Sequence, residues 1–267
     1  MPTRQPTLYL PHGGGPCFFM DWTMGPADTW DATAAWLRSI PQALPTAPKA
    51  LLVVSAHWEE QVPTILSRAT PELLFDYYGF PPHTYELTWP VVGEVGVAVR
   101  VRELLADAGI ESAVEANRGY DHGVFVPLKV AWPGADVPVV QLSLVAGLDP
   151  AHHLAIGRAL APLRDEGVLI IGSGMSYHDM RGFGSSRALR TSEIFDQWLT
   201  HVCREPGRAR ADHLAEWEAA PAGRASHPRE EHLLPLHVCA GAAGEDPGAV
   251  AFSDVVMAAR VSAIRFG

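Results

Sequence analysis

Four short, nearly unbroken apolar runs stand out along the chain, and all are rich in valine, isoleucine and leucine. They lie at residues 7–10, 50–56, 137–145 and 167–173. Such runs are typical of parallel strands whose two faces are both covered by helices. The pattern therefore predicts four central strands.

The segments between these runs place apolar residues at helical spacing instead. Helices are expected over residues 26–40, 92–109, 151–167, 191–203 and 229–244. Gly109 and Gly167 end two of these segments, as glycine commonly does at a helix C-terminus. The last apolar stretch, 249–266, predicts a final strand or a strand pair.

Strand and helix alternate along most of the chain, which is typical of helices packed on both faces of a mostly parallel sheet. We predict an α/β fold, a single three-layer domain over residues 1–267 with a mostly parallel central sheet flanked by helices. The aromatic, proline-rich segment 62–92 fits neither pattern. We expect it to form an edge hairpin or strand followed by a long ordered excursion, and such loops often carry function.

Composition narrows the choice of partners. The 267 residues are 48% hydrophobic and 19% charged, as in a soluble globular protein. A net charge of −10 argues against nucleic acid or an anionic membrane as the main partner, because both attract basic surfaces. The sequence shows no signal-peptide or membrane-spanning pattern. The three cysteines, Cys17, Cys203 and Cys239, form no CxxC pair, and we expect a cytoplasmic protein.

Twelve histidines are many for this length. We expect four of them to lie at the surface: His152, His153, His201 and His213. Three others each follow an apolar run within a few residues, namely His12, His57 and His178. Because the carboxyl ends of parallel strands meet at one edge of a sheet, this repeated arrangement predicts that the three imidazoles converge there.

Two further histidines stand near expected helix starts. His122 lies in the polar turn of "YDHG", and His232 lies in the first turn of the helix expected over 229–244. His237 is five residues beyond His232 and does not share its helical face. Imidazoles without thiolates suit Zn, Fe, Cu or Ni. The spacing leaves open a non-haem iron oxygenase and a hydrolytic zinc site with a bound water.

Other common catalytic motifs are missing from the sequence. No HExxH string occurs, and "GSGMSY" (172–177) is neither a nucleophile elbow nor a dinucleotide-binding fingerprint. The "GGGP" of residues 13–16 lacks the Lys-Ser/Thr of a P-loop. These glycines form either a tight turn beside an incidental His12 or a site where a ligand approaches His12 closely.

The order of several motifs resembles the DOPA-dioxygenase-like branch of the class III extradiol ring-cleaving dioxygenases, the LigB-type superfamily. The motifs are "PHGGGP", "VVSAHWE", "YYGFPPHTYELTWP", "GYDHGVFVPL", "VPVVQLSL", "IIGSGMSYHDMR" and "HPREEHLLPLHV". The resemblance spans residues 7 to about 244. It implies one catalytic domain that opens a catechol-type ring with O2. Some relatives have "HGSP" where this chain has "HGGGP", which would alter packing near the metal more than its ligation.

The resemblance also implies roles for individual residues. His12, His57 and His232 match metal ligands, and Glu231 is a fallback ligand because other branches use a glutamate there. His178 matches a histidine that ligates the metal or acts as acid–base catalyst. His122 matches a catalytic histidine that contacts substrate or dioxygen. Fe(II) is expected for activity, with Zn(II) as a competing occupant because such sites bind it more tightly.

Substrate contacts are less well defined. Tyr77, Tyr78, Phe80 and Trp89 would line a pocket for an aromatic ring, or pack against one another within a long loop. Of these, we expect Tyr78 and Phe80, with His122, to bind the substrate. Arg118, Lys129 and Arg181 are candidates to bind a substrate carboxylate. A zinc hydrolase and a non-catalytic binding protein are the alternative functions, and a homodimer is possible.

Overall fold

The four apolar runs predicted as strands lie side by side at the centre of one sheet. In the computed structural model, which describes residues 4–267, the sheet has eight strands in the order β4-β3-β5-β2-β6-β1-β8-β7. The strands are β1 (Thr7–Pro11), β2 (Ala50–Glu60), β3 (Thr64–Leu66), β4 (Ala113–Glu115), β5 (Val139–Val145), β6 (Val168–Gly174), β7 (Gly248–Val256) and β8 (Ala259–Phe266). The central four, β5-β2-β6-β1, are parallel.

Antiparallel pairs flank this parallel centre. On one side β8 pairs with β1 and β7 pairs with β8, so the last apolar stretch is a strand pair. On the other side β3 runs antiparallel to β5 and parallel to β4. The mostly parallel sheet that the sequence predicts is therefore confirmed.

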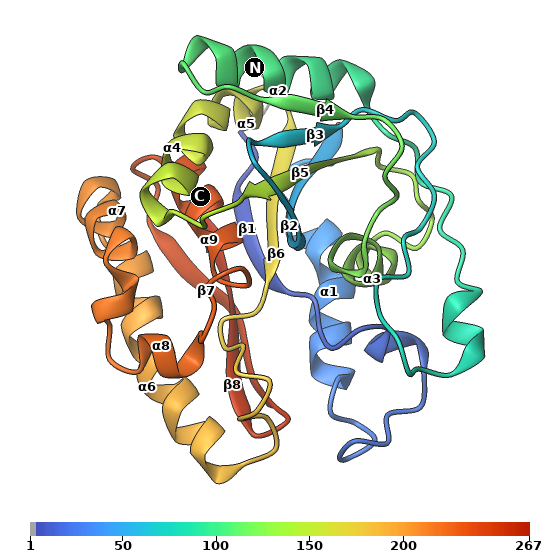
Figure 1. Cartoon of the computed structure of the whole chain (residues 1–267), viewed down its shortest axis with the longest axis vertical. Helices are drawn as coiled ribbons and strands as arrows, with labels where there is room; N and C mark the ends of the chain where they lie inside the picture. Colours follow the sequence, from blue (N-terminus) through green and yellow to red (C-terminus); the bar gives the residue numbers. More distant parts are fainter. Residues whose placement is uncertain (1–3) are drawn as a thin grey trace.

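Helices cover both faces of the sheet, as Figure 1 shows. They are α1 (Asp31–Ala43), α2 (Val95–Asp107), α3 (His122–Ala131), α4 (Pro150–Leu160), α5 (Pro162–Asp165), α6 (Ser186–Cys203), α7 (Gly207–Ala215), α8 (Gly223–Ser226) and α9 (Leu234–Ala243). Single 3-10 turns are η1 (Cys17–Phe19), η2 (Pro82–Tyr85) and η3 (Trp217–Ala219).

The unbroken apolar pattern of the central strands results from this layering. In β2, Leu51 and Val53 pack toward α1 and α3, whereas Leu52 and Val54 pack toward α2, α4 and α9. Since successive side chains of a strand point to opposite faces, a strand between two helical layers needs apolar residues at every position. The described residues form a three-layer α/β domain, as predicted.

Several helix boundaries differ from the sequence prediction. The segment expected as one helix over 151–167 is two, because Pro162 starts the short helix α5 and lacks the amide that would continue α4. The segment 229–244 becomes helical only at Leu234, so His232 lies in the preceding turn. Helices α7 and α8 had no clear apolar period in the sequence and were not predicted.

The surface position expected for His153 is wrong. Its side chain is fully buried on α4, where Nε2 accepts a hydrogen bond from the Val145 amide at 3.1 Å and Nδ1 lies 2.7 Å from the Asp149 carbonyl. His201 and His213 are exposed and His152 is half-buried. The histidine at 153 therefore serves to pair backbone groups at the end of β5.

The segment 62–92 is ordered without being regular. It forms β3 next to the sheet edge, continues without a helix or long strand, and turns once in η2. Isolated bridges from Leu73 to Tyr120 and from Gly93 to Val139 tie it to the rest of the molecule. Among the helices of residues 4–267, none is both long enough and apolar enough to span a bilayer.

Candidate metal centre and substrate cavity

The carboxyl ends of the parallel strands deliver histidines to one place. His12 directly follows β1, and His57 lies near the end of β2, where the pairing with β5 shifts register. His178 follows β6 by four residues. In Figure 1 the chain leaves both β1 and β6 at the lower ends of these two strands. The convergence predicted for these three imidazoles is what the fold produces.

Two helix starts complete the cluster. His122 is the first residue of α3, and His232 lies in the turn before α9. The carboxylate of Asp121, just before α3, is buried and accepts hydrogen bonds from Ser55 at 2.7 Å and Arg118 at 3.0 Å, with a third from Gln141. These contacts anchor the start of α3 against β2 and so fix His122 beside His57.

The five imidazoles form two adjoining groups. In the first, His12 and His57 have their Nε2 atoms 3.1 Å apart, and the ring centroids of His57 and His122 are 3.9 Å apart. In the second, His178 and His232 stack with ring centroids 3.3 Å apart. The His232 ring lies 5.1 Å from that of His12 and 4.9 Å from that of His57, which joins the groups.

This geometry fits a metal ion. Two imidazole nitrogens bound at about 2.0–2.1 Å to a tetrahedral ion lie about 3.3 Å apart, close to the 3.1 Å between the Nε2 atoms of His12 and His57. The ligand atoms of His12, His57 and His122 all lie within 4.8 Å of one another, and so do those of His178, Glu231 and His232. The residues present can therefore hold an ion among them.

Burial keeps the imidazoles of three histidines neutral. It lowers the pKa of His12 and of His232 well below the usual value, and neighbouring histidines lower both further. Burial, reinforced by His122 and opposed by Asp76, lowers the pKa of His57 to about 3. Neutral imidazole is the form that binds a metal. The site is therefore prepared for ligation at neutral pH.

Hydrogen bonds to Nδ1 fix which nitrogen remains free. Ser173 donates to the Gly123 carbonyl, so its hydroxyl oxygen accepts from Nδ1–H of His12 at 3.1 Å. Carboxylates play the same part elsewhere, with Asp76 2.8 Å from Nδ1 of His122 and Glu231 3.0 Å from Nδ1 of His232. Each contact leaves Nε2 unprotonated and able to bind a metal or a substrate proton.

Glu231 also contacts a second ring. Its Oε1 lies 3.3 Å from Nδ1 of His178, and Arg229 lies 3.3 Å from its other oxygen. Burial raises the pKa of Glu231, but the hydrogen bond with His178 and the nearby Arg229 outweigh this, so the pKa is lowered overall. The structure thus places an ionised carboxylate beside two rings, where it can orient both.

The turn after β1 requires glycine at two of its positions. Gly13 and Gly15 have φ values of +88° and +54°, a region that glycine adopts without strain. A Cβ on Gly13 would lie 2.4 Å from Sγ of Cys17, and one on Gly15 would lie 2.8 Å from the Phe80 ring. The turn therefore lets Phe80 approach the backbone next to His12.

A cavity of about 390 Å³ opens above the histidines, within the ~300–1,000 Å³ range of small-molecule sites. Tyr77, Tyr78 and Phe80 line it, as expected for this aromatic segment. Trp89 does not, because it is buried in the core and donates to the Trp132 carbonyl at 2.9 Å. The cavity is also lined by residues that sequence reasoning missed: Trp22, Met24, Trp30, Met175, Met180, Phe183 and Met257.

Asp76 is the other residue that sequence reasoning missed. It lies between Phe75 and Tyr77 in the aromatic segment 62–92, which also contains Glu72 and Glu86. Beside its contact with His122, its Oδ2 lies 3.9 Å from Nδ1 of His57. The available signal was an acidic residue placed directly between two aromatic residues.

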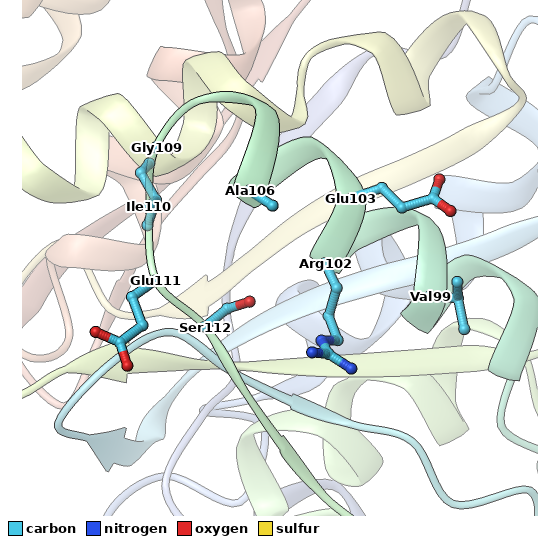
Figure 2. A pocket seen from close by; sticks show the side chains of 8 residues that line it. All are labelled: Val99, Arg102, Glu103, Ala106, Gly109, Ile110, Glu111 and Ser112. Atoms are coloured by element: carbon cyan, nitrogen blue, oxygen red, sulfur yellow. The ribbon is translucent and has the colours of Figure 1, made fainter.

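A second pocket, beside α2, lacks the histidines that metal binding would need. It has a volume of about 490 Å³. Figure 2 shows Val99, Arg102, Glu103 and Ala106 on α2, with residues 109–112 on the segment that follows. Its lining within the described chain includes no histidine or cysteine. The histidine-based cavity is therefore the candidate site.

Comparison with known proteins identifies relatives of this chain. Residues 6–265 match the model of the catalytic LigB subunit of aromatic ring-opening dioxygenase. A 4,5-DOPA dioxygenase extradiol of Portulaca grandiflora is 42% identical over 214 residues, which is 79% of this chain and 77% of that protein. The dioxygenase tasH of Hapsidospora irregularis is 36% identical over 259 residues, which is 90% of this chain and 79% of that protein.

A solved structure shares the fold of this chain. The crystal structure of an uncharacterised protein of Escherichia coli K12 superposes with a TM-score of 0.78 at 28% sequence identity, covering 99% of this chain and 100% of that chain. Sequence and fold thus agree with these relatives over most of the chain. The chain belongs to the LigB family of catalytic subunits of aromatic ring-opening dioxygenases.

Proposed function

We propose that this protein is a non-haem, metal-dependent extradiol dioxygenase that opens a catechol-type ring with O2, with residues 1–267 acting as one catalytic domain. The observation that carries the proposal is the meeting of five imidazoles at the base of an apolar cavity. Family membership and relatives named as extradiol DOPA dioxygenases support it.

His12, His57 and His232 are the proposed metal ligands. All three have a lowered pKa, and in His12 and His232 the Nδ1 contacts leave Nε2 free. When bound, Fe(II) supplies Lewis acidity and a route for electron density between an electron-rich ring and dioxygen. His178 is a fourth candidate ligand. Zn(II) is a competing occupant because it binds such sites more tightly than Fe(II).

His122 and His178 are the proposed acid–base residues, since ring cleavage requires a diol proton to be removed and a proton to be supplied to the leaving oxygen. Each histidine has a carboxylate at Nδ1, Asp76 for His122 and Glu231 for His178. A carboxylate in this position stabilises the imidazolium that forms when Nε2 takes up a proton. Either ring can therefore accept and return one proton.

Tyr78, Phe80 and His122 are the proposed substrate contacts. Phe80 lies directly over the glycine turn beside His12, and Tyr78 stands at the exposed mouth of the cavity. A flat ring held between these side chains and the histidines would place its two hydroxyl groups at the proposed metal site. The cytoplasmic location and the homodimer stay predictions, to be checked by cell fractionation and light scattering.

Dioxygen uptake tests the proposal directly. Protein stripped of metal is reconstituted anaerobically with Fe(II), offered a panel of catechols with O2, and watched for a yellow ring-opened product. Uptake that requires Fe(II) and His57 would support the dioxygenase. Absence of uptake across the panel, with Fe(II) shown to be bound, would reject it in favour of a zinc hydrolase or a binding protein.

A further inference from the structure

The wall of the cavity beyond the histidines is apolar and rich in methionine. This part of the wall is formed by Trp22, Trp30, Met175, Phe183 and Met257. Trp22 and Trp30 pack edge to face, with ring centroids 5.5 Å apart, and both are buried. Methionine side chains are flexible and make favourable contacts with aromatic rings, so they adapt to apolar ligands of varied shape.

The mouth of the cavity is apolar as well. Three of its lining residues are strongly exposed, with Tyr78 91%, Met180 70% and Met24 55% accessible to solvent. Large apolar side chains are rarely exposed together unless they form a binding surface. Their position around one opening indicates that an apolar part of the ligand reaches the mouth.

The cations expected near a substrate carboxylate lie elsewhere. Lys129 donates to the Thr88 carbonyl at 2.7 Å, and Arg118 donates to Asp121 and to the His57 carbonyl. Arg181 is exposed and is not part of the lining. Within residues 4–267, no arginine or lysine lines the cavity.

The carboxylates beside the histidines would also disfavour an anionic ligand. Asp76 contacts Nδ1 of His122, and Glu231 contacts Nδ1 of His178. The cation beside Glu231 is Arg229, which already pairs with Glu59 at 2.6 Å. A carboxylate on a side arm that points away from the metal site would lose its water in this cavity without gaining an arginine or lysine partner, which is unfavourable. An alkyl group would only lose contact with water.

We infer that the substrate of this enzyme is a catechol whose ring substituent is uncharged and apolar, and not one that bears a carboxylate. The inference rests on the proposed ring cleavage and adds the class of substituent to it. It separates this chain from enzymes that act on a catechol amino acid, whose side arm carries both an acid and an amine.

Matched substrates provide the test. The Fe(II)-loaded enzyme is assayed by dioxygen uptake with 4-propylcatechol, 3-(3,4-dihydroxyphenyl)propanoate and unsubstituted catechol. Both side arms attach through methylene groups, so the ring electronics are closely similar. We expect kcat/KM for the propyl compound to exceed that for the acid by about tenfold or more. Equal values, or a preference for the acid, would overturn the inference while leaving ring cleavage intact.

Binding without turnover separates the two proposals. Metal-free protein is titrated by calorimetry with 4-propyl-1,2-dimethoxybenzene and with 3-(3,4-dimethoxyphenyl)propanoate, which cannot be cleaved or chelated as diols. Tighter binding of the neutral compound supports the apolar site even if no catechol is consumed. Tighter binding of the acid contradicts it.

A specificity switch provides a second test. Met180→Arg places a cation at the mouth, and Met180→Leu is the matched apolar control. We expect the arginine variant to raise the acid-to-propyl ratio of kcat/KM by about fivefold, the size expected for a partly exposed ion pair. The leucine variant should keep the original ratio. An unchanged ratio in the arginine variant would show that the side arm lies elsewhere and would overturn the inference.

Discussion

Asp76 holds His122 at two points. Its Oδ1 accepts a hydrogen bond from the His122 amide at 2.9 Å and lies 2.8 Å from the ring Nδ1, although the residues are 46 apart in sequence. One carboxylate oxygen therefore satisfies a backbone donor at the start of α3 and fixes the orientation of the ring. The irregular segment 62–92 thus supplies part of the proposed catalytic apparatus.

We expect Asp76→Ala to lower kcat/KM for ring cleavage by about 10–100-fold, the range typical of groups that orient a catalytic or ligating histidine. Asp76→Asn should lose less, because its amide oxygen can still accept from the backbone and from Nδ1. Steady-state dioxygen uptake measures the effect. Bound iron and thermal unfolding are measured in parallel, and wild-type kcat/KM in a folded alanine variant would contradict the assigned role.

His178 is proposed both as an acid–base residue and as a ligand, and one comparison separates the two roles. His178→Phe keeps the ring stacked on His232, whose centroid is 3.3 Å away, but removes both nitrogens. If His178 transfers protons, turnover falls by about 10²–10⁴-fold while the iron content stays near wild type. His12→Ala, the control, should lose the metal. A matching loss of iron in His178→Phe would instead make His178 a ligand.

The sequence predicted the central sheet and the convergence of His12, His57 and His178 because both follow from local patterns. Buried parallel strands need continuous apolar runs, and their carboxyl ends share an edge. The positions of His122 and His232 could not be predicted from local patterns alone. Their approach to the other rings depends on how α3 and α9 pack on β2 and β6, which no local period encodes.

What the sequence could not provide were contacts between distant segments. Trp22 and Trp30 line the cavity because the chain turns back after the glycine turn, and Met257 reaches it from the β7–β8 hairpin. His153 was misplaced because histidine side chains are more often found at the surface than fully buried. Burial of a polar ring becomes favourable only when both nitrogens find partners, and that is a property of the fold.

Two neighbouring glycines should differ in their tolerance of the same substitution. Gly13→Ala is expected to destabilise the protein by about 1–3 kcal/mol, because φ is +88° and the added methyl would overlap Sγ of Cys17. In Gly14→Ala the nearest atom would be 3.7 Å away, on Trp30, so stability should change little. Urea unfolding measures both. Equal stability of the two variants would show that the turn is not constrained as described.

Burial of His153 should make the stability of the fold depend on pH. Burial lowers the pKa of His153 to about 4, and hydrogen bonding to Asp149 only partly opposes this. Nε2 of His153 accepts from the Val145 amide, and a protonated ring cannot accept there. The unfolded chain, with a pKa near 6.5, therefore binds this proton more readily than the folded protein. Stability present above pH 6.5 is lost as the pH falls from about 6.5 toward 4.

Between pH 7 and pH 5 this one histidine should reduce the free energy of unfolding by about 2 kcal/mol. His153→Gln, whose side chain stays neutral, should be correspondingly less sensitive to pH over that interval. The measurement is urea unfolding of metal-free protein at both pH values, which removes any contribution from metal binding. His201→Gln, at an exposed position, serves as the control and should keep the wild-type dependence. If His153→Gln loses as much stability as the wild type, burial of His153 does not control the acid sensitivity of the fold.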